Sequence, residues 1–300
     1  LRNPALIIPA LGHRGFFNWM NDKFYLKMIY RILMGKKLDL DNPQTFNEKI
    51  QWLKLYDRRP EYTQMVDKYK AKQYVASIIG EEYIIPTLGV WDCFDDIDFD
   101  NLPKQFVLKC THDSGGLVIC RDKSKLDREA VRKKITSCLK HNYYWGMREW
   151  PYKDVKPQII AEKYMVDEAG ESQSIKDYKL MCFHGRVRCS FTCTNRQSNK
   201  GLNVTFFDTE WKRLPFERHY PVDVQEIKRP QTYEEMCNLA EKLSQRMVFS
   251  RIDFYEISGR PYFGEITFYP GSGMEKFTPE KWDEELGKLI HLPQKCGGRI

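Results

Sequence analysis

Apolar positions predict helices over the first part of the chain. Residues at three- and four-residue intervals predict one face of a first helix: Phe17, Met20, Phe24 and Met28. Thr45 and Glu48 have the spacing of a capping box, which predicts a helix from there through Leu55. A further helix is predicted from about Glu61 to Gly80.

The pattern then changes to short apolar runs bounded by glycine and polar residues, which are typical of strands. The predicted strands span residues 106–110, 117–120, 158–165, 178–183, 187–192, 249–257 and 261–268. Helices are predicted at 128–141, from a second capping box at Thr232 and Glu235, and from Thr278-Pro279.

Length and composition fit a soluble globular protein. The 300 residues are enough for two or three packed lobes, and 42% are hydrophobic and 30% charged. The opening apolar run, Pro4 to Leu11, is shorter than the roughly 20 residues of a membrane span and lacks the flanks of a signal peptide. We expect a cytoplasmic protein without a transmembrane segment. The chain begins at Leu1 rather than Met, which leaves room for a leader that has been removed.

The net charge of +7 suits an anionic ligand, such as a nucleotide, an acidic sugar, a membrane surface or a nucleic acid. Without a zinc-finger or aromatic RNA-binding signature, nucleic acid is disfavoured. The nine cysteines have no framework spacing and predict free thiols in a reducing compartment. The nearest approach to a metal cluster is Cys182, Cys189 and Cys193 with His184, for which free thiols are again the favoured interpretation.

The last two predicted strands form a hairpin with one charged face. A three-residue loop, Ser258 to Arg260, places Ile257 opposite Pro261. Counting outward, Asp253 then faces Glu265, and Arg251 faces Thr267.

Two opposed carboxylates repel each other, so the hairpin predicts a positive partner. Arg251 in a salt bridge and a Mg²⁺ ion with oxygen ligands are both consistent with the pattern. The glycines that follow in 269–273 allow close backbone approach and favour a site. The same repulsion predicts that Glu265→Gln raises the melting temperature of the unliganded protein.

Basic residues and glycines mark two further candidates. Lys109 interrupts the apolar strand at 106–110 and must extend to solvent or find an anion. The turn Ser114-Gly115-Gly116 can direct N–H groups at phosphate or be an ordinary hairpin turn, and it lacks the Gly-Lys-Ser/Thr of a P-loop. The segment 162–165 either offers its backbone to an adenine edge or is an ordinary strand end.

Taken in order, these motifs resemble the ATP-grasp superfamily from about Asp67 to Gly273. The resemblance implies an ATP site formed by Lys68, Lys109, Ser114, Gly115, Gly116, Glu162, Lys163, Tyr164, Met165, Asp177 and Lys179. It implies catalytic roles for Arg251 and Lys109 and Mg²⁺ ligation by Asp253 and Glu265. Thr267 is a weaker third ligand, because the superfamily usually has Asn there.

Segments 42–54, 106–116 and 263–270 are similar to the TupA-like branch found among bacterial surface-polysaccharide genes. Its loop usually reads His-Gly-Ser-Gly, whereas here it reads His112-Asp113-Ser114-Gly115. The resemblance implies an α/β (α+β) chain with the ATP-grasp fold, in which two α+β lobes clasp ATP. The expected division is a helical N-terminal segment at 1–66, lobe 1 at 67–170 and lobe 2 at 171–300.

The implied reaction is ATP- and Mg²⁺-dependent amide formation, through an acyl phosphate, between an acidic sugar such as a uronic acid and an amino acid or related amine. The implied partners are a polysaccharide precursor and, by peripheral association, polysaccharide assembly machinery. Candidate acceptor contacts are Arg186, Arg188, Arg196 and Arg218. One alternative is a glycosyltransferase with Asp96-Ile97-Asp98 as its metal motif, and another is a non-catalytic nucleotide-binding protein.

Overall fold

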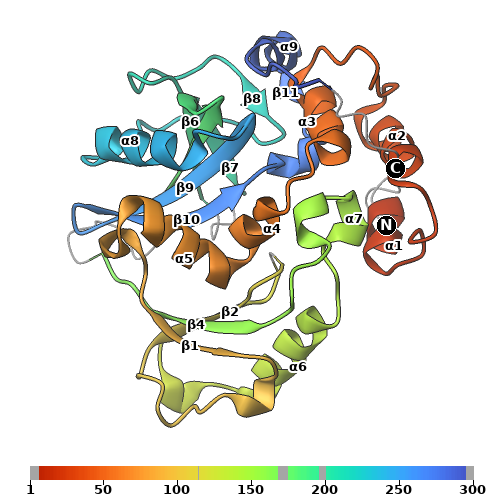
Figure 1. Cartoon of the computed structure of the whole chain (residues 1–300). Helices are drawn as coiled ribbons and strands as arrows, with labels where there is room; N and C mark the ends of the chain where they lie inside the picture. The colour runs from red at the N-terminus through yellow and green to blue at the C-terminus, as the bar shows by residue number, and fades with distance from the viewer. Residues whose placement is uncertain (1–6, 114, 168–174, 196–200, 295–300) are drawn as a thin grey trace.

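Two antiparallel sheets form the framework of the protein (Figure 1). The computed structural model describes residues 7–113, 115–167, 175–195 and 201–294. The small sheet has strand order β1-β4-β2-β3, with β1 Thr87–Trp91, β2 Phe106–Cys110, β3 Leu117–Cys120 and β4 Ile159–Lys163. The large sheet has order β10-β9-β5-β6-β7, with β5 Asp177–Phe183, β6 Arg186–Thr194, β7 Asn203–Phe207, β9 Phe249–Ile257 and β10 Arg260–Thr267. A short two-stranded sheet joins β8 Glu217–Arg218 to β11 Phe277–Thr278.

Helices lie around and between the sheets. They are α1 Ile7–His13, α2 Asp22–Met34, α3 Phe46–Tyr56, α4 Glu61–Val66, α5 Lys68–Ile79, α6 Arg128–Leu139, α7 Tyr144–Met147, α8 Tyr233–Ser244 and α9 Lys281–Lys288. Helix α6 packs on the small sheet through Val131 and Ile135, and α8 packs against β5, β6 and β9. Helices α4 and α5 contact β10 and lie between the two sheets (Figure 1). Within the described residues, no helix is both long and apolar enough to cross a membrane.

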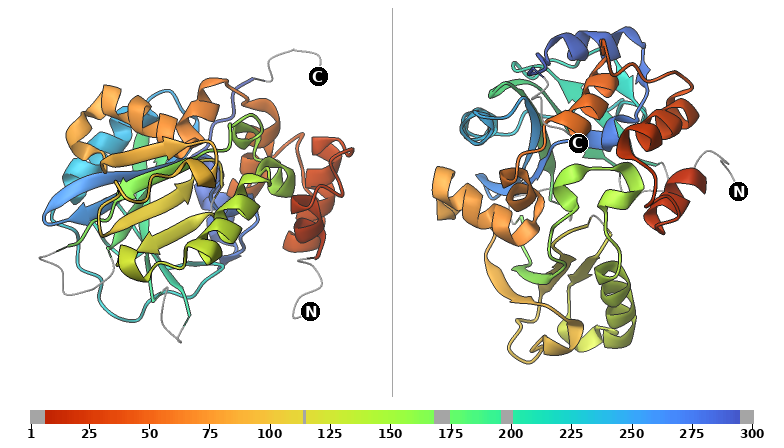
Figure 2. Two further views of the ribbon diagram at one scale, coloured as in Figure 1. Left: turned by 90° about the horizontal axis from the view of Figure 1, so that it is seen from below. Right: turned by 45° about the vertical axis from the view of Figure 1, so that its right-hand side comes forward.

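The N-terminal helices differ from the predictions in two places. Helix α2 begins at Asp22, so Phe17 and Met20 precede it, and Phe24 is 63% exposed instead of facing the core. The predicted helix from Glu61 to Gly80 is broken at Asp67, whose carboxylate accepts the N–H groups of the first turn of α5. Helices α1 and α2 lie together at one side of the molecule (Figure 2).

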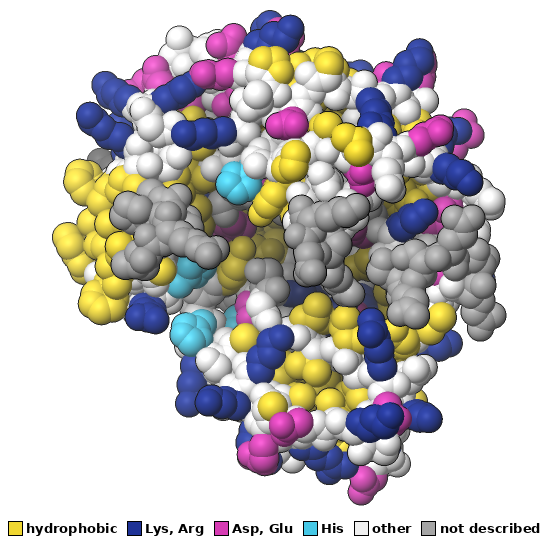
Figure 3. Space-filling model, turned by 180° about the vertical axis from the view of Figure 1, so that it is seen from behind, with side chains coloured by type: hydrophobic (Ala, Val, Ile, Leu, Met, Phe, Trp, Pro, Cys, Tyr) yellow, Lys and Arg dark blue, Asp and Glu magenta, His cyan; other side chains and the backbone are white. Residues whose placement is uncertain are grey.

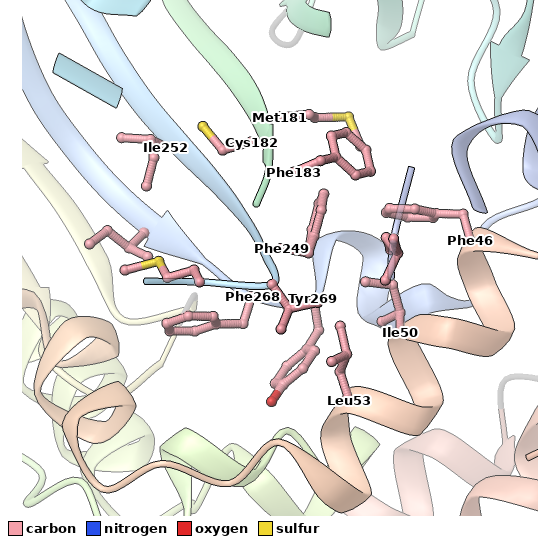
Figure 4. Close-up of a cluster of buried hydrophobic side chains, with 14 of the residues drawn as sticks. Phe46, Ile50, Leu53, Met181, Cys182, Phe183, Phe249, Ile252, Phe268 and Tyr269 are labelled. Atoms are coloured by element: carbon pink, nitrogen blue, oxygen red, sulfur yellow. The ribbon is translucent and has the colours of Figure 1, made fainter. Parts of the chain in front are cut away.

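Helix α3 is fixed by its cap and by its apolar face. The predicted capping box between Thr45 and Glu48 is confirmed. Phe46, Ile50 and Leu53 then project into the large core cluster near Phe249 (Figure 4). The rings of Phe46 and Phe249 meet edge to face, 5.1 Å apart. Each such buried side chain stabilises the docking of α3 by about 1.5–3 kcal/mol.

The β9–β10 hairpin has the predicted pairing at the charged residues but a different turn. Arg260 pairs with Ile257, so the loop has two residues and the predicted three-residue loop is wrong. Ser258 and Gly259 both have positive φ, 51° and 71°, as a type I′ turn requires. A bulge between Phe263 and Glu265, at Gly264, then shifts the register by one residue.

After this bulge, Glu265 pairs with Asp253 and Thr267 with Arg251, as predicted. The capping box predicted at Thr232 is wrong, because its hydroxyl donates to Glu256 (2.8 Å) and no side-chain cap forms. Glu235 instead accepts a hydrogen bond from the Tyr83 hydroxyl. The three-part division of the chain stays a prediction.

Candidate functional site

One face of the large sheet carries a row of paired residues from edge to edge. Along this row β10, β9, β5, β6 and β7 contribute, in turn, Glu265, Asp253, Lys179, Phe191 and Phe206. Residues that pair directly on neighbouring strands project from the same face. The row is therefore charged at the β10 edge and aromatic at the β7 edge.

Arg251 lies between the two opposed carboxylates. Its Nε and Nη2 donate to the two oxygens of Asp253 at 2.6 and 2.8 Å, and Nη2 also lies 2.5 Å from Oε1 of Glu265. Lys179 donates to Asp253 as well, and its Nζ lies 2.8 Å from Asp177. The repulsion expected between the carboxylates is therefore offset by two cations of the protein itself.

These charges keep Glu265 ionised. Burial opposes its ionisation, but Arg251, Lys179 and Lys68 outweigh that effect and lower the pKa of Glu265 to about 2. The Glu265 side chain is 46% exposed to solvent, whereas the Asp253 side chain is 4% exposed. The hydrogen bonds of Glu265 use Oε1, one of them from the Thr267 hydroxyl at 3.2 Å.

Burial raises the pKa of Asp253, and Arg251 and Lys179 oppose that rise. Two carboxylates on rigid, paired strands are a suitable donor set for Mg²⁺, which takes few protein ligands and leaves room for phosphate oxygens. Asp253 and Glu265 fit that ion. Thr267 fits it less well, because a neutral hydroxyl is a weaker Mg²⁺ ligand than a carboxylate.

A second charged group lies on the small sheet. The Glu162 carboxylate is 2.5 Å from Nζ of Lys72 and 2.5 Å from Nζ of Lys109. The anion expected beside Lys109 is thus Glu162. Burial opposes this ionisation too, but the two lysines lower the pKa of Glu162. The sequence argument missed Lys72, although it lies four residues after Lys68 and so on the same face of α5.

The predicted phosphate loop is tied to the start of α5. The backbone N–H of Lys68 donates to the Thr111 carbonyl at 3.0 Å. Its Nζ donates to the carbonyls of Cys110, at 3.1 Å, and Asp113. The N–H of Gly116 donates to the Asp113 carboxylate, at 3.0 and 3.1 Å to its two oxygens. Ser114 lies outside the described residues.

The predicted adenine hinge, residues 162–165, begins with the last two residues of β4 and continues beyond the strand. Lys163 has an exposed side chain, and its backbone N–H donates to the Pro86 carbonyl at 3.0 Å. Tyr164 and Met165 are half-buried in the segment beyond it.

Half-exposed apolar side chains lie beside Lys109 and were not predicted. Leu117 pairs with Lys109, and Ile119 pairs with Val107, so both lie on the Lys109 face of the sheet. They are 42% and 45% exposed. The run 117–120 is apolar throughout, so its pattern carries no signal for which of its side chains face the site. Figure 3 shows a hollow across the molecule, between the larger and the smaller body, in which basic and acidic side chains are visible.

The family follows from a comparison with known families. The profile of TupA-like ATP-grasp proteins matches residues 48–291. The chain belongs to the TupA-like ATP-grasp family. This membership confirms the predicted ATP-grasp fold.

Solved ATP-grasp structures are similar at low identity. D-alanine–D-alanine ligase from Bacillus anthracis, complexed with ATP, is 16% identical over 75% of this chain and 63% of that chain, with a TM-score of 0.42. The ligase from Helicobacter pylori is 14% identical over 84% and 68%, with a TM-score of 0.47. The ATP-grasp ligase PsnB, complexed with minimal precursor, is 9% identical over 89% and 69%, with a TM-score of 0.44. The chain thus spans less than two thirds of the Bacillus anthracis ligase. No curated protein matches the chain significantly.

The TupA-like opening segment supports the loop that follows β10. Gln51 donates from Nε2 to the carbonyls of Ser272 and Gly273, at 2.9 and 2.8 Å. Lys54, which is fully buried, donates to the Ser272 carbonyl at 2.7 Å. The Ser272 hydroxyl in turn donates to the buried carboxylate of Glu149. One helix face therefore fixes the glycine-rich loop directly after Glu265 and Thr267.

The structure separates the four candidate acceptor arginines of this TupA-like chain. Arg186 pairs with Glu241 of α8, Arg188 is exposed, and Arg196 lies outside the described residues. Arg218 is 5% exposed, and its guanidinium lies 4.7 Å from the ring centre of Phe191. Arg251 lies 5.8 Å from the same ring, so Arg218 extends the charged row toward β7.

Three other groups lie apart from this site. Asp96 and Asp98 are exposed, and Asp98 accepts N–H groups of its own loop. Cys182 contacts the Ala240 carbonyl on the α8 side, whereas Cys189 lies 3.7 Å from the Met181 sulfur. A cavity of about 560 Å³ is lined by Thr205, Arg213, Leu214, Pro215, Phe216, Glu217, Val222 and Thr278, and none of these described residues was predicted for the site.

Proposed function

We propose that this protein forms an amide between a carboxylate and an amine, with an acyl phosphate as intermediate. The observation that carries the proposal is the approach of the two charged groups. Lys68 lies close enough to interact electrostatically with both Glu265 on the large sheet and Lys109 on the small sheet. Tyr255 of β9 likewise lies near Glu162 and Asp253. A polyphosphate between the sheets would therefore meet lysines on one side and metal ligands on the other.

We assign the nucleotide to the space beside the small sheet. Lys68, Lys109 and Lys72 neutralise phosphate charge. The N–H of Gly116 could add a donor to phosphate only after leaving the Asp113 carboxylate, to which it donates here. Adenine would pack on Leu117 and Ile119, which are exposed on the Lys109 face, and would meet the backbone of the hinge. The residues of that hinge are Glu162, Lys163, Tyr164 and Met165, and Asp177 and Lys179 reach toward the ribose and phosphates.

Asp253 and Glu265 would hold Mg²⁺, which neutralises charge on the transferring phosphoryl group. Arg251 spans both carboxylates and is directed into the same face, so it can orient the acid and stabilise negative charge as it develops. A carboxylate oxygen attacks the γ-phosphorus, and ADP leaves. The amine then attacks the carbonyl carbon, loses a proton, and expels phosphate.

The acid that we propose is a uronic-acid-type sugar of a surface polysaccharide or its precursor, and the amine is an amino acid or a related compound. Arg218 supports an anionic acceptor, because this buried guanidinium, which pairs with Glu275 at 2.9 Å, lies close enough to Arg251 to interact with it electrostatically. Because the proposed reaction consumes ATP, we place it in the cytoplasm.

The decisive experiment follows one oxygen atom. The protein is incubated with ATP, Mg²⁺, an amino acid and a glucuronic acid oligosaccharide labelled with ¹⁸O in its carboxylates. The acyl-phosphate route transfers one label to inorganic phosphate, which mass spectrometry detects. An amide formed with unlabelled phosphate, or AMP and pyrophosphate as products, would exclude this route.

A further inference from the structure

Two cysteines and one aspartate come together beneath the predicted phosphate loop. Cys110 is the last residue of β2, Asp113 lies in the loop that follows, and Cys138 lies in the last turn of α6. Their two sulfur atoms and a carboxylate oxygen all lie within 4.8 Å of one another. Asp113 is also the residue at which the loop departs from the TupA-like pattern, and the proposed ligase reaction gives its carboxylate no role.

Neighbouring groups hold these three side chains in place. Both oxygens of Asp113 accept the Gly116 N–H, so the carboxylate is turned back toward its own loop. The Cys110 sulfur lies directly beneath Gly116, where an added Cβ would be only 2.5 Å from it. Nε2 of His112 lies 3.2 Å from the Cys138 carbonyl, which ties the loop to the end of α6.

Two thiolates and a carboxylate match the ligand preferences of Zn²⁺. In a tetrahedral site with bonds of about 2.0–2.3 Å, ligand atoms lie roughly 3.3–3.8 Å apart, so shifts of about 1 Å or less would close this group around an ion. Mg²⁺ prefers oxygen ligands alone, which distinguishes this group from Asp253 and Glu265. Cys138 is only partly buried, so water can complete the coordination.

The surrounding charge also suits a bound ion. Two thiolates, one carboxylate and one divalent cation have a net charge of −1. Burial and the Asp113 carboxylate raise the pKa of both thiols in the metal-free protein, while Lys68 opposes that rise at Cys110 and Lys134 opposes it at Cys138. These lysines offset the remaining negative charge.

We propose that Cys110, Asp113 and Cys138 form a binding site for a thiophilic divalent cation, for which Zn²⁺ is the natural probe. Such an ion joins the loop to α6. The ion would also affect the position of Lys68, whose Nζ donates to the main-chain carbonyls of Cys110 and Asp113.

The test uses the reduced full chain, free of nucleotide, titrated with Co²⁺ and then with Zn²⁺ in competition. The expected result is one equivalent of Co²⁺ with thiolate-to-metal charge-transfer absorption, which Zn²⁺ displaces. Cys138→Ser should abolish this absorption and weaken Zn²⁺ binding by at least about tenfold. Because Cys110 is fully buried and its replacement endangers folding, Asp113→Asn is the second variant and should also weaken binding.

Two controls separate this site from others. Cys93→Ser removes an exposed thiol, and Asp253→Asn alters the proposed Mg²⁺ site, so both should keep the absorption. Persistence of the absorption in Cys138→Ser, or its absence from the parent protein, would overturn the proposal. So would a Cys110–Cys138 disulfide in the isolated protein with no affinity for Zn²⁺ after reduction. No step uses ATP or an acid, so the result is independent of the ligase reaction.

Discussion

Lys109 and Glu162 form an ion pair with a separation of 2.5 Å on the small sheet. Glu162 is shared with Lys72, so two lysines face one carboxylate and the group keeps a net positive charge. A buried cation that is only partly neutralised favours an anionic ligand. For a member of the ATP-grasp family, we expect this anion to be the phosphates of ATP.

The first prediction is that Lys109→Met weakens ATP binding by about 10- to 100-fold, which corresponds to the loss of one charge-assisted hydrogen bond. The fold should persist, because Lys72 still neutralises Glu162. Calorimetric titration with ATP and Mg²⁺ measures the change. Lys70→Met, which removes an exposed lysine from the same helix as Lys68, is the matched control and should bind normally. Equal affinity in the two variants would contradict the assignment of Lys109.

The second prediction concerns Glu265 and pH. Its pKa of about 2 lies below the usual value of about 4.3, so its ionised form stabilises the fold above about pH 4.5. That contribution is lost as the pH falls toward 2. Glu265→Gln should therefore lower the melting temperature at pH 6 and have a smaller effect at pH 3.5. The side chain is half exposed, so the difference should remain below about 1 kcal/mol.

This expectation reverses the one drawn from the sequence, which considered repulsion from Asp253 without the position of Arg251. The same variant should lose Mg²⁺-dependent turnover, because a neutral amide is a weaker ligand than a carboxylate. Thermal unfolding at both pH values tests the first part. A melting temperature that rises at pH 6 would restore the repulsion argument.

The β9–β10 hairpin illustrates how much of this site the sequence could predict. Period-two alternation correctly assigned Asp253 and Glu265 to one face and to one pair. The turn was one residue shorter than predicted, and the bulge at Gly264 compensated for that error. Alternation describes a regular ladder, and the compensating bulge depends on local backbone geometry that the hydrophobic pattern does not encode.

Contacts between distant segments were harder to predict. Lys72 could be found from its spacing after Lys68, but its pairing with Glu162 needs the packing of α5 on the small sheet. The approach of Cys138 to Cys110 depends in the same way on how α6 docks. Arg218 was one of four equal candidates until its position over Phe191 distinguished it. Local patterns specify elements, whereas these contacts arise from tertiary packing.

The third prediction uses the bulge itself. A Cβ at Gly264 would lie 3.1 Å from the Asp253 carbonyl oxygen and 3.2 Å from the Tyr255 ring. Gly264→Ala should therefore displace the backbone beside Asp253 and raise the Mg²⁺ concentration needed for half-maximal turnover. This effect should be larger than the loss of stability. Gly259→Ala, at the turn, is the control: its φ of 71° makes it costly to stability, but it lies far along the hairpin from the carboxylates. Turnover measured against Mg²⁺ concentration compares the two, and an unchanged requirement in Gly264→Ala would count against metal binding at this pair.

The last prediction concerns Lys54, which the TupA-like opening segment places beneath the loop after β10. Its Nζ donates to Gln51, to the Met147 carbonyl at 3.0 Å and to the Ser272 carbonyl. Burial lowers its pKa to about 8, and the nearby charge of Glu149 opposes that shift. Lys54→Met would remove the hydrogen bonds to the Met147 and Ser272 carbonyls and the charge that partly offsets the burial of Glu149, and we expect a loss of about 2–3 kcal/mol in the free energy of unfolding.

A second substitution distinguishes stability from positioning of the loop. Lys54→Met combined with Glu149→Leu removes both charges, so much of the lost stability should return, as measured by urea denaturation. Mg²⁺-dependent turnover should stay low, because Ser272 has lost the Lys54 donor and the Glu149 acceptor that fix the loop. Lys49→Met is the control from the same helix, since Lys49 donates to the Gly287 carbonyl instead of to this loop. Full recovery of turnover in the double variant would show that Lys54 only stabilises the fold. Recovery of stability without turnover would show that Lys54 also positions the loop after β10.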